Sequence, residues 1–138
     1  MPDFDLGRFT TAQDGVIDTA LAEIAAGAKR SHWIWFVFPQ IAGLGHSPTA
    51  RHFAIVSLDE ARAYLAHPVL GTRYRAAVAA LQGVAGGTAE GVFGAVDAMK
   101  LRSSLTLFEA AGVDVGAALD RWFGGKRDAR TLEVLGAG

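Results

Sequence analysis

The sequence predicts an all-α fold, a single domain over residues 1–138 built from about six or seven helices. Apolar residues recur at helical spacing in one segment after another, and glycines or prolines separate these segments. Segments in which apolar and polar residues alternate, the pattern of half-buried strands, are few. A chain of 138 residues is long enough for one hydrophobic core, because a domain of about 150 residues buries roughly 70% of its unfolded surface.

Local start and stop signals place the helices along the chain. Thr10 and Gln13 have the spacing of a capping box, and Gly27 ends the helix that they begin. Ser57 and Glu60 form a second capping box, and Asp97 has the position of an N-cap further on. The helices predicted in this way cover about residues 12–26, 48–55, 57–66, 70–82, 98–111, 114–123 and 128–135, with one short turn within 88–94.

Residues 29–40, called the aromatic segment below, are the most distinctive part of the chain. They hold Trp33 and Trp35, two of the three tryptophans, directly beside basic and polar residues. Residues 33–38 are all apolar, and at that length periodicity does not separate a short buried strand from a buried helical turn.

Composition narrows the classes of function. A formal net charge of -1 provides no overall field that would attract nucleic acid or anionic lipid. Cysteine is absent, and the four histidines lack the HxxxH or HExxH spacing of metal sites, so we expect neither a metal nor a cofactor. The N-terminal residues do not have the pattern of a secretory signal and no segment is long enough to cross a bilayer, so we expect a cytoplasmic protein without membrane contacts.

Side chains in and just after the aromatic segment suggest a site for a planar or anionic small molecule. Aromatic rings would stack on such a ligand, while Arg and Lys side chains would hold its phosphate or carboxylate. His32 is the candidate for proton transfer, since imidazoles titrate near neutral pH. The predicted ligand-binding residues of this region are Lys29, Trp33, Trp35, Gln40, Ser47 and Arg51. The competing interpretation is that the aromatic rings simply pack in the core.

A second group of polar residues, Asp97, Lys100, Ser103 and Ser104, lies on the helix predicted at residues 98–111 or at its start. Neighbouring Ser and Lys side chains on a helix can serve as nucleophile and base, whereas an ion pair between Asp97 and Lys100 is the purely structural alternative. We predict catalytic roles for His32, Lys100 and Ser104, a ligand-binding role for Asp97, and a hollow between residues 29–51 and the helix at 97–108.

Four motifs carry a resemblance to a known family. They are SHWIWFVFPQ at residues 31–40, GLGHS at 43–47, EARAYLAHPVLGTR at 60–73 and FGAVDAMKLRSSLTLF at 93–108. With them the sequence resembles an uncharacterised all-helical domain family of mostly bacterial proteins of unknown function, some of them labelled calpastatin. The resemblance covers residues 9–135 and implies a multihelical fold but no particular reaction. The signature positions that it implies are His32, Trp33, Trp35, Gln40, Lys100 and Ser104.

The chain departs from this family only by apolar replacements, at Val16, Tyr74 and Leu105, which leave the expected fold unchanged. The order of its motifs is also similar to that of the NADAR families, helical N-glycosidases tied to NAD and ADP-ribose metabolism. The invariant motifs of those enzymes are not recognisable in this sequence.

We therefore predict a protein that binds or acts on a nucleotide- or ribose-like anion, with N-glycosidase-like chemistry implied by the NADAR similarity alone. The alternative is a protein-interaction module that uses exposed aromatic side chains and has no catalytic activity. Nucleic-acid binding would need a basic face, and the two basic pairs at residues 29–30 and 126–127 are too few to form one.

Overall fold

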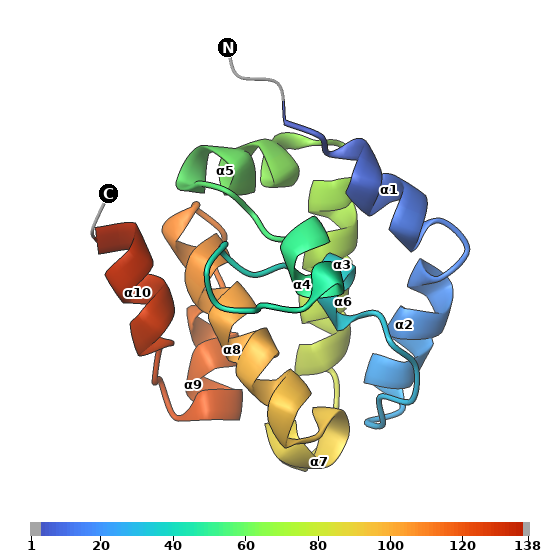
Figure 1. Cartoon of the computed structure of the whole chain (residues 1–138). Helices are drawn as coiled ribbons and strands as arrows, with labels where there is room; N and C mark the ends of the chain where they lie inside the picture. Colours follow the sequence, from blue (N-terminus) through green and yellow to red (C-terminus); the bar gives the residue numbers. More distant parts are fainter. Residues whose placement is uncertain (1–3, 137–138) are drawn as a thin grey trace.

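The computed structural model describes residues 4–136, and in that range ten α-helices surround one hydrophobic core (Figure 1). The helices are α1 (Gly7–Gln13), α2 (Ile17–Ala25), α3 (Ile34–Val37), α4 (Pro48–His52), α5 (Leu58–Ala66), α6 (Leu70–Gln82), α7 (Ala89–Phe93), α8 (Ala95–Ala110), α9 (Gly116–Phe123) and α10 (Ala129–Gly136). The part of the chain described contains no strand, and its β pairing is an isolated parallel bridge between Ile41 and Ile55. The all-α class is confirmed.

The predicted number of helices, six or seven, is too low, and the N-terminal region shows one reason. The single helix expected at residues 12–26 is two helices, because Gly15 adopts a φ of 82° and breaks the backbone between α1 and α2. Thr10 and Gln13 do not form a capping box. The Thr10 hydroxyl donates to the Gly7 carbonyl, and the buried Gln13 amide donates to the Phe36 carbonyl (2.7 Å) and the Tyr64 hydroxyl (2.9 Å).

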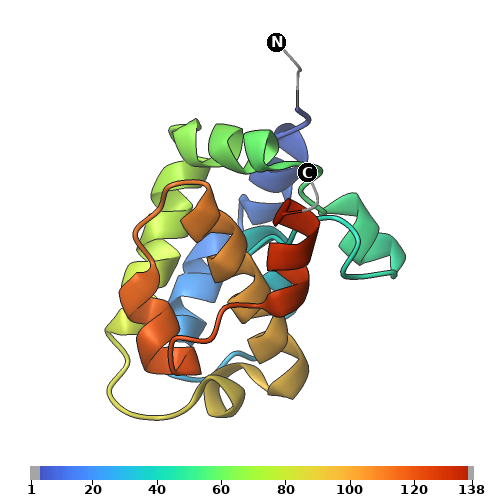
Figure 2. The same cartoon turned by 90° about the vertical axis from the view of Figure 1, so that its left-hand side faces the viewer.

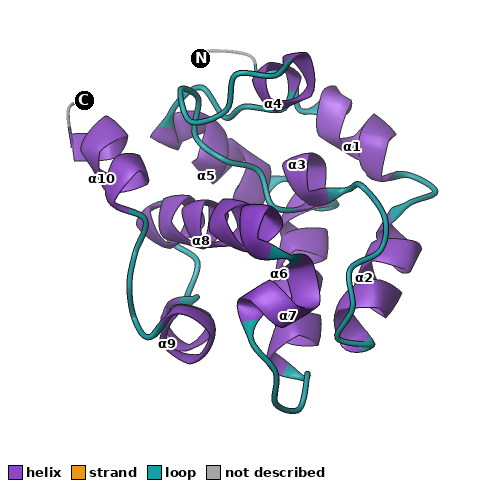
Figure 3. Ribbon diagram, turned by 60° about the horizontal axis from the view of Figure 1, so that its bottom comes forward, coloured by secondary structure: helices purple, strands orange, loops and turns teal. Residues whose placement is uncertain are grey.

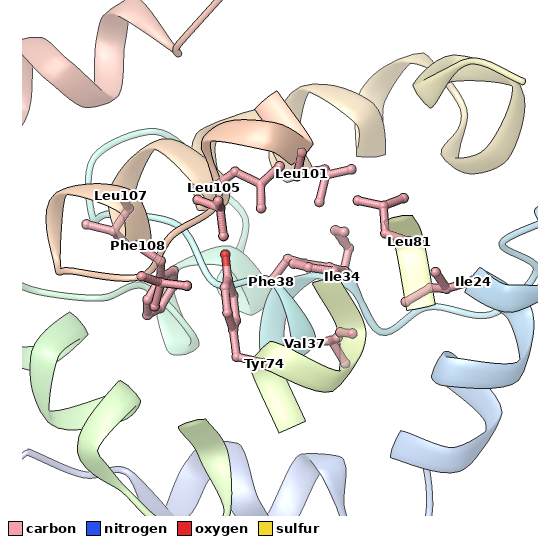
Figure 4. Packing of buried hydrophobic residues seen from close by; sticks show 14 of the residues in the cluster. Ile24, Ile34, Val37, Phe38, Tyr74, Leu81, Leu101, Leu105, Leu107 and Phe108 are labelled. Atoms are coloured by element: carbon pink, nitrogen blue, oxygen red, sulfur yellow. The ribbon is translucent and has the colours of Figure 1, made fainter. Parts of the chain in front are cut away.

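The apolar run at residues 33–38 is a single helical turn, α3, so the strand considered for it is wrong. This turn contacts α1, α6 and α8, and Ile34 and Phe38 point into the same interior as Leu101 and Leu105 of α8 (Figure 4). Because the turn is packed on several sides, its outward-facing side chains are held in fixed positions.

Buried aromatic rings join the helices of the core to one another. Tyr74 of α6 packs against Phe108 of α8 (centroids 4.4 Å apart) and against Phe38 (5.6 Å), and Tyr64 of α5 packs against Phe9 of α1 (5.1 Å). Offset and edge-to-face pairs of this kind add about 0.5–1.5 kcal/mol each to the effect of area burial.

Side-chain caps fix several helix starts, of which the sequence predicts the one at Ser57. Ser47, Ser57 and Thr88 accept hydrogen bonds from backbone N–H groups in the first turns of α4, α5 and α7. Helix α8 begins three residues before the predicted start, at Ala95, so Asp97 lies within its first turn and does not cap it.

The peripheral helices differ in how they meet the body. Helix α4 has no buried residue and projects from the molecule (Figure 2). Helix α10 lies at the edge against α8 (Figures 1 and 3), and Asp128 starts it by accepting from the N–H (2.9 Å) and hydroxyl (2.6 Å) of Thr131. None of the described helices is both long enough and apolar enough to span a membrane.

Gly71 at the start of α6 permits a close approach between α5 and α6, and its replacement is a direct test of this packing. A Cβ at this position would lie 2.1 Å from the carbonyl oxygen of Leu65. Gly71→Ala is expected to lower the free energy of unfolding by about 1–3 kcal/mol in urea denaturation, since the backbone would have to move. Gly7→Ala in α1 is the control, because its Cβ would meet Asp5 at an ordinary 3.6 Å. Equal effects of the two replacements would contradict the close approach.

Candidate functional site

The aromatic segment is attached to α2 through the carboxylate of Glu23. This carboxylate accepts hydrogen bonds from the backbone N–H groups of Arg30 (2.8 Å) and Ser31 (2.9 Å), from the Ser31 hydroxyl, and from the indole N–H of Trp33 (2.9 Å). Partial burial alone would raise the pKa of Glu23, but these hydrogen bonds to its charged form outweigh that effect and lower the pKa to about 2. Glu23 therefore holds the segment in place as an anion.

A second carboxylate, Asp97 of α8, holds the other side of the segment through Lys29. The Lys29 ammonium lies 2.7 Å from Asp97 Oδ2, donates to the Ser31 carbonyl (2.6 Å) and sits 5.0 Å from the centre of the Trp33 ring. Only 6% of the Lys29 side chain is exposed. The aromatic segment and α8, which are distant in the sequence, are therefore in direct contact.

Lys100 lies one turn further along α8 than Asp97 and is bound less tightly than Lys29. Its ammonium is 3.4 Å from Asp97 Oδ1 and 4.6 Å from the centre of the Trp35 ring, a cation–π distance. Within residues 4–136 it makes no shorter polar contact. Of its three N–H donors, at least two are therefore available to a ligand.

A hollow of about 190 Å³ lies between the loop after α3, the first half of α8 and the start of α10. Its lining residues are Gln40, Leu44, Gly45, Val96, Met99, Lys100, Ser103, Asp128 and Arg130. A smaller crevice beside it shares Gln40 and Gly45 and is lined also by Trp35. Of the residues predicted from sequence, Lys100 and Gln40 line the hollow. Trp35 and Asp97 contact Lys100, and Lys29 contacts Asp97, so these three lie next to the hollow.

Several lining residues were not predicted, and some of them carried a sequence signal. Val96, Met99, Lys100 and Ser103 follow one another at intervals of three, one and three residues, which places them on one face of α8. Within the second polar group, that spacing would have assigned the site role to Ser103 in place of Ser104. Asp128 and Arg130 are brought to the hollow by the packing of α10 against α8, for which no local signal exists.

Ser104, predicted as catalytic, does not line the hollow. It is fully buried on the neighbouring face of α8, and its hydroxyl lies 3.0 Å from the hydroxyl of Tyr74. Burial raises the pKa of Tyr74 well above its ordinary value, and the hydrogen bond with Ser104 offsets only part of that increase. The pair is a satisfied polar contact inside the core.

The remaining candidates are also outside the hollow. Trp33 is fully buried, so it is available neither for stacking on a ligand nor for contact with a partner protein. His32 is exposed and is not among the residues that line the hollow. Ser47 caps α4, and Arg51 is exposed on that same projecting helix. The described residues contain no cluster of three or more His, Asp or Glu side chains suited to a metal ion.

Comparison with known proteins places the chain in a family. A family model described as "Protein of unknown function (DUF1810)" matches residues 3–135. The chain belongs to the DUF1810 family. No curated protein matches it.

One solved structure is closely similar to this DUF1810 protein. It is the crystal structure of the conserved hypothetical protein Rv1873 from Mycobacterium tuberculosis, with a TM-score of 0.93 and 45% sequence identity. The match covers 96% of this chain and 97% of the mycobacterial one. The two proteins therefore share the fold over nearly their whole lengths.

Replacement of Glu23 tests how the aromatic segment is held. Glu23→Gln is expected to lower the free energy of unfolding at pH 7 by about 1.5–3 kcal/mol, since hydrogen bonds to a charged group are lost. The folded-state pKa of about 2 is below the ordinary 4.5, so the stabilisation is present above pH 4.5 and is lost as the pH falls toward 2. The difference between wild type and variant should therefore shrink over that pH range in urea denaturation.

Glu90→Gln, at an exposed position of α7, is the matched control and should leave stability nearly unchanged at each pH. A wild-type minus Glu23→Gln difference that is independent of pH would contradict the role assigned to the Glu23 carboxylate.

Proposed function

We propose that this DUF1810 protein binds a small organic anion in the hollow between the 40–45 loop, α8 and α10, with Lys100 as its charged contact. The observation that carries the proposal is the difference between the two lysines beside Asp97. Lys29 is buried and its polar contacts are short, whereas Lys100 borders the hollow with only a long contact to Asp97. Lys29 thus has a structural role, and the ammonium of Lys100 has N–H donors available for a ligand.

Trp35 contributes by positioning Lys100. One face of its ring carries the Lys100 ammonium, so that face does not stack on a ligand. The aromatic face attracts the cation and orders the flexible lysine side chain before a ligand arrives. Binding then costs less side-chain conformational entropy. We therefore assign to Trp35 a positioning role in place of the predicted stacking role.

The charges around the hollow favour an anion. Four cationic side chains lie in or next to the lining: Lys29, Lys100, Arg102 and Arg130. Only two carboxylates do, Asp97 and Asp128. Asp128 also forms a long ion pair with Arg102, at 4.0 Å. This local excess of positive charge exists although the whole chain carries a net charge of -1. Except for the exposed Arg130, these groups are partly buried, which strengthens their effect on a small ligand because solvent screens them less.

Binding, and no particular reaction, is what the geometry supports. The predicted proton-transfer residue His32 and the predicted nucleophile Ser104 both lie outside the hollow, so N-glycosidase-like chemistry has no assembled set of groups there. The ligand class expected from the sequence, a nucleotide- or ribose-like anion of the cytoplasm, is consistent with the mixed apolar and cationic lining.

Thermal unfolding with a panel of metabolites tests the proposal. Nucleoside monophosphates, sugar phosphates and sugar acids at about 1 mM should include at least one that raises the Tm of the wild type by about 3 °C or more, as expected for a ligand present far above its Kd. Lys100→Met, which keeps the apolar part of the side chain but removes the charge, should abolish that shift.

Lys126→Met is the matched control, because Lys126 is exposed and does not line the hollow. Its ligand-induced shift should equal that of the wild type. The proposal fails if no member of the panel changes the Tm, or if the shift survives in Lys100→Met.

A further inference from the structure

We infer that the anion is a polyhydroxylated one, a single sugar unit that bears a phosphate or a carboxylate, and that Asp128 binds its hydroxyl groups. This inference rests on the proposed function and concerns the same hollow. Two observations support it. The carboxylate of Asp128 lines a site whose other charged groups attract anions, and the site is small.

One oxygen of Asp128 is used within the protein and the other is available. Oδ2 accepts the hydrogen bonds from the N–H and hydroxyl of Thr131 that start α10. Oδ1 lies 4.0 Å from the nearest Arg102 nitrogen, which is beyond hydrogen-bonding distance. An ionised carboxylate accepts hydrogen bonds and donates none, so Oδ1 is open to a donor from the ligand.

An anionic group cannot satisfy Asp128, whereas sugar hydroxyls can. Hydroxyl donors form short, charge-assisted hydrogen bonds with carboxylates, and acidic side chains bind ribose hydroxyls in this way in dinucleotide-binding folds. A phosphate or carboxylate placed against Asp128 would instead be repelled. The ligand therefore needs donors on the side of Asp128 and negative charge on the side of Lys100 or Arg130.

The rest of the lining matches such a molecule. Ser103 donates its hydroxyl proton to the Met99 carbonyl (3.0 Å), so toward the hollow its oxygen offers lone pairs to a hydroxyl donor. Gln40 supplies an amide that can both donate and accept. The apolar side chains of Leu44, Val96 and Met99 can cover the carbon-bound face of a sugar ring.

The volume of the hollow indicates how much of a ligand it can cover. Sites for drug-sized molecules usually measure about 300–1,000 Å³. The hollow, at about 190 Å³, is smaller and suits one sugar unit with one anionic group. A dinucleotide would extend far outside it.

Isothermal titration calorimetry with two matched ligand pairs tests the inference on the whole chain. The phosphate pair is ribose 5-phosphate and propyl phosphate, and the carboxylate pair is glucuronate and cyclohexanecarboxylate. In at least one pair, the hydroxylated member should bind wild type about tenfold or more tightly than its hydroxyl-free partner, because the latter leaves the partly buried Asp128 Oδ1 without a donor.

Asp128→Asn should reduce this preference to about twofold or less while the hydroxyl-free anion binds as well as to wild type or better, because a repelling charge is removed. Asparagine is also a good N-cap, so α10 should remain folded, and circular dichroism and thermal unfolding check this. Asp114→Asn, an exposed site that does not line the hollow, is the charge-matched control and should keep the wild-type preference.

The outcomes separate this inference from the proposed function. Equal binding of both members of each pair by wild type, or a hydroxyl preference that survives in Asp128→Asn, overturns the role of Asp128 but leaves an anion site that depends on Lys100. Absence of binding by all four compounds overturns the sugar-anion inference and, together with a metabolite panel that gives no thermal shift, the proposed function as well.

Discussion

The buried ion pair between Lys29 and Asp97 is the contact on which the candidate site depends. An ammonium that is almost completely removed from water is tolerated only with a charged partner and further acceptors, and Asp97 and the Ser31 carbonyl provide them. With Glu23 holding the same segment from α2, carboxylates on two different helices fix the aromatic segment. Trp35 is thereby presented to α8, and Asp97 keeps one oxygen for Lys100.

This arrangement explains why two lysines that share one carboxylate differ in role. The ion pair of Lys29 joins elements that are far apart in the sequence, so its loss would separate the segment from α8. The contact of Lys100 with Asp97 is within one helix, at i and i+3, and is worth only a few tenths of a kcal/mol in exposed helices. Lys100 can therefore exchange Asp97 for a ligand without disturbing the fold.

The sequence was sufficient for the helical class, for the cap at Ser57, and for the expectation that the aromatic segment meets the helix that carries Lys100. It was insufficient to decide which of two consecutive helical residues faces the site, because their side chains point only about 100° apart around the helix axis. Ser104 faces the core because Tyr74 of α6 packs against its side of α8, and Ser103 faces the hollow. Trp33 is buried and Trp35 is only partly buried because α3 turns between α1, α6 and α8. Asp128 and Arg130 reach the site because α10 packs against α8. This is a tertiary contact that no local sequence pattern encodes.

Met99 is the most direct reporter of whether a ligand binds in the hollow beside Lys100. It lines the hollow and is one of only two methionines in the chain, so a ¹³C-labelled methionine methyl group gives a nearly background-free NMR signal, assigned with Met99→Leu. On titration with ribose 5-phosphate or glucuronate, the Met99 resonance should move to saturation with the same Kd that calorimetry gives, and it should not move in Lys100→Met. A ligand that binds by calorimetry while the Met99 resonance remains unmoved would show that the binding site lies elsewhere on the molecule.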